Sequence, residues 1–110
     1  MGTIKSSREI DKIFRESRRA AHPLLIALVA PTPEGRGPMG RVAFIAGKRL
    51  GGAVLRNRCK RVMREAVRRA GGPWSGRDVL LIARPGTASA STAALDAALS
   101  SVLTRAGVSS

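Results

Sequence analysis

Three short aliphatic runs, each closed by proline or glycine, are the feature that most constrains the fold of this chain. They are LLIALVA at residues 24–30, RVAFIAG at 41–47 and VLLIA at 79–83. Runs of this length, rich in Leu, Ile and Val and bounded by turn residues, are typical of buried strands. None is long enough to cross a bilayer, so together they predict a small internal sheet that other elements must cover.

Three further segments have the apolar spacing of helices. The first is predicted over residues 7–19, where the sequence SSRE at 6–9 has the form of a capping box, and Pro23 prevents its continuation. A second helix is predicted over residues 53–70, ending at a Gly-Gly-Pro sequence, and a third over residues 89–105.

This order of elements predicts an α+β protein with three helices packed on a small mixed sheet of three to four strands, in the order α-β-β-(β)-α-β-α. The brackets mark a further short strand at residues 20–24, which the sequence pattern neither predicts nor excludes. The Pro- and Gly-rich segment 31–40 is expected to be a mobile hairpin loop between the first two aliphatic runs. With 110 residues, two Phe, one Trp and no Tyr, the chain is expected to form one domain, 1–110, with an aliphatic core.

The net charge of +13 points to a polyanionic partner, and Arg greatly outnumbers Lys. The planar guanidinium group suits bidentate contacts with phosphate. An anionic membrane surface is the alternative partner, but it calls for bulky apolar anchors that are scarce here, so we expect no membrane association. The composition therefore favours nucleic acid.

More than half of this charge lies in residues 48–69, which hold nine cations and one acid. At helical spacing, one arc of roughly 140° is apolar and should face the sheet, and an adjacent arc of roughly 100° is basic. Like charges four residues apart on the basic arc repel by a few tenths of a kcal/mol per pair, which indicates an external polyanion. The apolar arc holds Leu55, Cys59, Val62, Met63, Ala66 and Val67, and the basic arc holds Asn57, Lys60, Arg61, Arg64 and Arg68. Glu65 lies outside both arcs and can pair with Arg61 and Arg69.

The residues that could support catalysis or redox chemistry are few. Cys59 is the only cysteine and falls on the apolar arc, so a buried inert thiol and no disulfide are expected. His22 is the only histidine, and we expect a surface position for it. The carboxylates are dispersed, so no catalytic residue and no metal site made of protein side chains is expected. Charges near the N-terminus disfavour a signal peptide, and we expect a cytoplasmic protein.

Residues 53–65, AVLRNRCKRVMRE, resemble the signature of the bacterial ribonuclease P protein component family, in which Arg-Asn-Arg is followed by Lys-Arg and then Arg-Glu. Residues 47–51, GKRLG, are similar to the family's Ser-Lys-Lys-x-Gly turn. Residues 76–85, GRDVLLIARP, match its Gly-x-Asp, apolar strand and Ala-Arg ending, and residues 10–14 sit where its first-helix motif lies. The likeness covers nearly the whole chain in order.

The resemblance implies a protein that joins a large catalytic RNA and assists removal of the 5′ leader from precursor tRNA. The RNA performs the chemistry, so Mg²⁺ is expected to be held mainly by the partner RNA, and no stable protein partner is implied. The resemblance also implies a left-handed crossover between parallel strands, although such crossovers are usually right-handed.

Carried over by position, the resemblance assigns two sets of residues. Ile10 and Ala27 stand where relatives often have aromatic residues, so leader capture is expected to depend on charge and aliphatic contact. The expected RNA-binding residues are Lys48, Arg49, Arg56, Asn57, Arg58, Lys60, Arg61, Arg64 and Arg68, and the expected leader-binding cleft contains Ile10, Phe14 and Ala27.

Two other functions fit the composition. A ribosomal or other RNA-scaffold protein without an enzymatic role would have similar charge, and ribosome co-sedimentation would favour it. A cationic protein of membrane surfaces is disfavoured by the lack of aromatic anchors, and vesicle binding without RNA would favour it.

Overall fold

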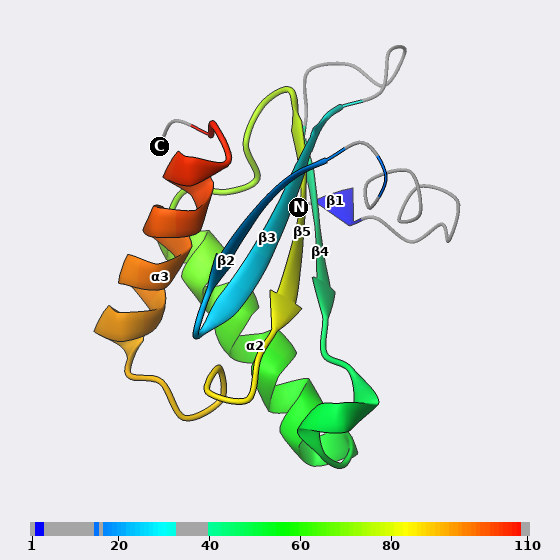
Figure 1. The fold of residues 1–110 in the computed structure, drawn as a ribbon, viewed down its shortest axis with the longest axis vertical. Helices are drawn as coiled ribbons and strands as arrows, with labels where there is room; N and C mark the ends of the chain where they lie inside the picture. The colour runs from blue at the N-terminus through cyan, green and yellow to red at the C-terminus, as the bar shows by residue number, and fades with distance from the viewer. Residues whose placement is uncertain (1, 4–14, 16, 33–39, 109–110) are drawn as a thin grey trace.

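The computed structural model describes residues 2–3, 15, 17–32 and 40–108. Within them a mixed sheet has the order β1-β4-β5-β3-β2, with helices α2 and α3 packed on one face (Figure 1). Four strands form the body of the sheet and a two-residue strand, β1, extends it, which confirms the α+β class. The strands are β1 Gly2–Thr3, β2 Arg18–His22, β3 Leu25–Pro31, β4 Arg41–Ile45 and β5 Arg77–Ala83. The helices are a 3-10 turn η1 Lys48–Leu50, α2 Ala53–Arg69 and α3 Thr92–Arg105.

Strand β5 lies at the centre of the sheet, parallel to β4 and antiparallel to β3. Its residues from Val79 to Leu81 are fully buried, as suits the central strand of the sheet. Because β5 separates β3 from β4, the predicted hairpin between the first two aliphatic runs is wrong. The hairpin of this region instead joins β2 to β3, whose pairing ends with His22 opposite Leu25.

The N-terminal helix predicted over residues 7–19 falls mostly outside the described residues. Its predicted end is wrong, because Arg18 and Arg19 already belong to β2. The optional short strand is therefore present, and it begins earlier than residue 20. Only Ala20 of β2 is buried, as suits an edge strand with one side chain packed against the core.

Alternate residues of each strand point to opposite faces of the sheet. The face that carries α2 and α3, here called the helix face, includes Ala27 and Val42, and Trp74 joins its otherwise largely aliphatic core. The opposite face, here called the second face, has a separate apolar cluster. That cluster contains Leu28, Ala30, Ala43 and Leu80, with Ile45 and Ile82 packed at its margin.

Helix α2 agrees closely with its predicted bounds and buries one side. Cys59, Met63 and Val67 are almost completely buried, as the apolar arc predicted. Leu55 is 40% exposed, so its expected packing on the sheet is wrong: it lies in the first turn of α2. Helix α3 begins at Thr92, where Ser91 caps it by accepting a hydrogen bond from the Ala94 amide.

Candidate nucleic-acid interface

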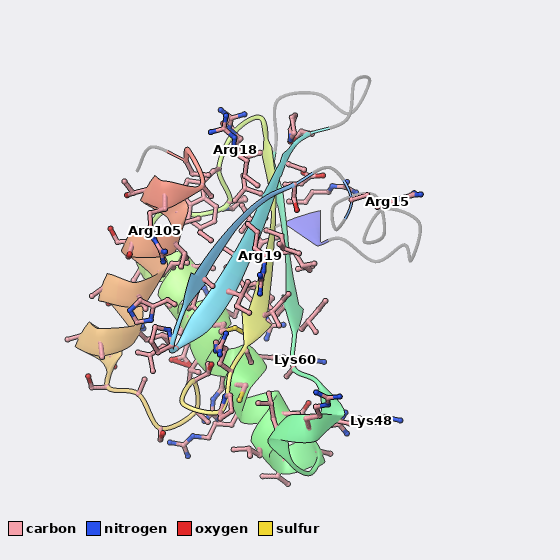
Figure 2. All side chains as sticks on the ribbon, in the orientation of Figure 1. Arg15, Arg18, Arg19, Lys48, Lys60 and Arg105 are labelled. Carbon is pink, nitrogen blue, oxygen red and sulfur yellow. The ribbon has the colours of Figure 1, made fainter. Side chains whose placement is uncertain are left out.

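The connection from β4 to α2 brings basic side chains to one end of the molecule. After β4, the turn η1 exposes Lys48 and Arg49 and contacts the start of α2. Figure 2 shows Lys48 at the lower end of the view, beside the first turns of α2. The structure therefore places the predicted turn cations next to the helix that carries the other predicted RNA-binding residues.

The predicted basic arc of α2 is on the outside of the molecule. Four of its residues are exposed and Lys60 is half-buried. The Arg64 guanidinium carbon lies 5.2 Å from the centroid of the Phe44 ring, a cation–π contact that fixes this cation at the end of β4. We call Asn57, Lys60, Arg61, Arg64 and Arg68 the basic face.

Some arginines of α2 form ion pairs with acidic side chains of the same chain. Arg61 reaches Glu65 at 3.8 Å, as predicted, and both side chains are largely exposed. The predicted pairing of Arg69 with Glu65 is replaced by a two-oxygen contact with Asp96 of α3 at 2.8–3.0 Å, because α3 packs beside this end of α2. The hydrogen bond with Asp96 raises the pKa of Arg69 above its ordinary value.

Arg56 and Arg58 differ in how they are held. Arg58 donates from Nε to the Ala88 carbonyl oxygen at 3.3 Å, which ties it to the loop before α3. The Nε of Arg56 is buried and has no hydrogen-bond partner in the part of the chain that the structure describes. Because a buried donor without a partner is costly, an oxygen supplied by a ligand would satisfy Arg56.

The acids of the described residues do not neutralise the rest of the basic face. Three acids lie in this part of the chain, and each is already in an ion pair: Glu65 with Arg61, Asp78 with Arg41 and Asp96 with Arg69. Asn57, Lys60, Arg64 and Arg68 therefore form a surface with no acidic partner among the described residues. Such a surface is suited to phosphate groups.

The predicted leader-binding cleft is the other site to compare with the structure, and the second face of the sheet is where it would lie. Ile10 and Phe14 lie outside the described residues. Ala27 is fully buried in the core of the helix face, so the prediction that it lines a leader-binding cleft is wrong. A shift of one position moves a strand residue to the opposite face, and Ile26 and Leu28 are the neighbours that point there.

Arg19 is a cation of the second face that the sequence prediction missed. It is exposed and lies opposite Leu28 in the β2–β3 pairing. Figure 2 shows its side chain over the sheet. The prediction placed Arg19 at the end of a helix; the available signal was Pro23, which could have indicated a hairpin whose first strand contains Arg19.

The remaining candidates have structural surroundings. Cys59 is 1% exposed, which confirms a buried thiol. His22 is half-buried and its Nδ1 accepts a hydrogen bond from the Leu24 amide at 3.0 Å, within the β2–β3 turn. Across the described ranges, no group of three or more His, Cys, Asp or Glu side chains could hold a metal ion, and no helix is long and apolar enough to cross a membrane.

A mixed sheet with two helices on one face, and a basic surface on α2 that has no acidic partner among the described residues, define a small basic α+β protein of the nucleic-acid-binding class. The family model described as Ribonuclease P matches residues 2–107. The chain belongs to the bacterial ribonuclease P protein component family.

Individual relatives agree with this assignment. The chain is 33% identical over 106 residues to the ribonuclease P protein component of Brevibacillus brevis, covering 96% of this chain and 82% of that protein. It is 37% identical over 107 residues to that of Gluconacetobacter diazotrophicus, covering 96% and 90%. The solved RNase P protein of Staphylococcus aureus is similar with a TM-score of 0.83 at 25% identity, covering 98% of this chain and 97% of that one. The Thermotoga maritima RNase P protein shares the fold, with a TM-score of 0.79 at 22% identity over 96% and 97% of the two chains.

Proposed function

We propose that this chain, as the protein subunit of ribonuclease P in tRNA 5′ maturation, binds the catalytic RNA through the basic face of α2 and the neighbouring turn η1. One observation carries this proposal: in a member of this family, the Arg-Asn-Arg helix presents cations that no acid of the described residues neutralises. Lys48 and Arg49 extend the same surface. Phosphate oxygens of the RNA would pair with its cations.

The cations of α2 contribute unequally to this binding. Lys60, Arg64 and Arg68 have no acidic partner among the described residues and would pair directly with phosphates. Arg56 would donate its buried Nε to an RNA oxygen. Arg58 and Arg61 already have protein partners, so binding of RNA would share or exchange those contacts.

The second face of the sheet would receive the single-stranded leader of precursor tRNA. Its floor is aliphatic, with Ile26, Ile45 and Ile82 partly accessible, and Arg19 stands beside it. Leader binding here depends on these aliphatic contacts and on charge, where aromatic residues would each contribute about 1–3 kcal/mol per base.

The chemistry of leader removal belongs to the RNA in this proposal. Mg²⁺ would be held mainly by RNA phosphates, and the donor set of the described residues fits that division because it is cationic and lacks a carboxylate or imidazole cluster. The basic face acts by neutralising phosphate repulsion between the catalytic RNA and its substrate. We place this activity in the cytoplasm and assign it to residues 1–110 as one domain.

The crossover from β4 through α2 to β5 is proposed to be left-handed. In Figure 1, β4 lies to the right of β5, both strands run downward, and α2 lies behind the sheet. A connection that passes behind the sheet and moves to the left between two downward strands is left-handed, whereas the usual crossover is right-handed.

Reconstitution tests the proposed function. The protein is added to a bacterial ribonuclease P RNA at low Mg²⁺, and cleavage of precursor tRNA is followed. The proposal expects faster cleavage and tighter substrate binding than with RNA alone. No stimulation of a correctly folded catalytic RNA, together with co-sedimentation of the protein with ribosomes, would favour an RNA-scaffold protein instead.

A further inference from the structure

Two exposed arginines, Arg18 and Arg77, line a cleft at the end of the molecule far from the turn η1. Arg18 begins β2 and Arg77 begins β5. The cleft has a volume of about 330 Å³; its other lining residues are Val29, Ala30, Pro31, Ala106 and Gly107. We call this the corner cleft.

The backbone at the end of α3 is capped without Arg18 or Arg77. The amides of Gly107 and Val108 already bond the carbonyl oxygens of Thr104 and Leu103, at 3.1 and 2.8 Å. Gly107 has a φ of +87°, the left-handed conformation that this helix ending requires. Arg105, which ends α3, has a structural role, since it donates to the Ala21 carbonyl oxygen at 2.7 Å.

Arg18 and Arg77 also lack acidic partners within the described part of the chain, where Glu65, Asp78 and Asp96 are all paired elsewhere. Two guanidinium groups that flank a cleft without a counter-charge would repel each other less if an anion lay between them. The cleft is far too small for a nucleic-acid duplex, but it has room for a single phosphate group.

The position of the corner cleft connects it to the second face of the sheet. Arg18 and Arg19 are consecutive residues of the edge strand β2, so their side chains point to opposite faces. Figure 2 shows Lys60, Arg19 and Arg18 following one another along the long axis of the molecule. A flexible strand lying on the second face beside Arg19 would reach Arg18 where it passes over the edge of the sheet.

We propose that the corner cleft binds phosphates of the part of the precursor tRNA leader that extends past the second face. This inference rests on the proposed function, because it assumes that the second face receives the leader. It adds a second contact that only longer leaders can make, with Arg18 and Arg77 as the phosphate-binding residues.

The test uses the reconstituted ribonucleoprotein with precursor tRNAs that carry leaders of about 4 and about 16 nucleotides, the range of site sizes in single-strand-binding domains. The variant Arg18→Gln/Arg77→Gln should abolish the affinity that the long leader adds and leave the short-leader affinity unchanged. Loss of two single-strand phosphate contacts should make the salt dependence of long-leader binding shallower by about 1.4 in log–log slope.

The matched control is Arg69→Gln/Arg84→Gln, which removes the same charge at positions outside the corner cleft. It should retain the long-leader advantage, and thermal unfolding checks that both variants fold. An unchanged advantage in Arg18→Gln/Arg77→Gln, or an equal loss with both leaders, would overturn the inference. Wild-type protein that stimulates cleavage without any long-leader advantage would also overturn it, whereas failure of wild type to stimulate cleavage would refute the proposed function itself.

Discussion

Asp78 links three segments of the sheet through one buried carboxylate. It is 1% exposed, and its oxygens accept hydrogen bonds from the Arg41 amide at 3.2 Å, the Arg41 Nη2 at 2.8 Å and the Thr32 hydroxyl at 3.2 Å. These contacts join the starts of β4 and β5 to the segment after β3. The carboxylate thus fixes the end of the sheet at which β5 enters.

Asp78→Asn should lower the free energy of unfolding by about 3 kcal/mol, because the substitution removes the buried negative charge that accepts the hydrogen bonds of Arg41 and Thr32. Denaturant unfolding monitored by circular dichroism measures this change. The control Asp96→Asn breaks the half-exposed pair with Arg69 and should cost less than about 1 kcal/mol. Equal costs for the two variants would contradict the account of Asp78.

Phe44 is proposed to position Arg64 for RNA through the cation–π contact. Phe44→Leu should weaken binding to the catalytic RNA by about two- to fivefold, equivalent to about 0.5–1 kcal/mol, and leave the salt dependence unchanged. Arg64→Gln should instead make the log–log salt slope shallower by about 0.7 to 0.9. Filter binding over a salt series separates the two effects, and a changed slope in Phe44→Leu would contradict the positioning role.

Helix α2 separates stability from binding on its two sides. Met63→Ala should destabilise the fold by about 2–5 kcal/mol, because the side chain is fully buried in the core of the helix face. At a temperature where this variant remains folded, its RNA affinity should have the wild-type salt slope. A shallower slope in the folded variant would show that burial and binding are not separable on this helix.

The helices and strands could be predicted to different degrees. The bounds of α2 follow from its apolar spacing and its Gly-Gly-Pro ending, so prediction and structure nearly coincide. The central position of β5 could not be predicted, because periodicity describes one strand at a time and carries no information on pairing. Arg18 and Arg19 were assigned to a helix because charged residues at its expected end resemble a solvated helix terminus.

The candidate site was predictable on α2 and uncertain on the sheet for a physical reason. The basic face follows from helical spacing, whereas residues 24–30 are aliphatic on both faces, so alternation could not show which side Ala27 occupies. The partners of Arg58 and Arg69 come from distant segments, the loop before α3 and α3 itself. Such long-range contacts appear only in the folded chain.

Among the described residues, the whole molecule combines an aliphatic second-face cluster with the cation Arg19 beside it. Because the described part of this face offers aliphatic contact and charge, binding of precursor tRNA leaders should be unusually sensitive to salt. The affinity difference between substrates with and without a leader, measured at low and high salt with Mg²⁺ constant, should shrink as salt rises. A difference that barely changes would contradict this reliance on charge.

The central claim is that RNA binds the cations of the basic face of α2 that have no acidic partner among the described residues. The most direct measurement is the affinity for the catalytic RNA across a salt series, for wild type, Lys60→Gln/Arg64→Gln and the equally charged control Arg69→Gln/Arg84→Gln. The account predicts that the first variant has a log–log slope shallower than wild type by about 1.4 to 1.8, and that the control stays close to wild type. A wild-type slope in Lys60→Gln/Arg64→Gln, or the same change in both variants, would contradict it.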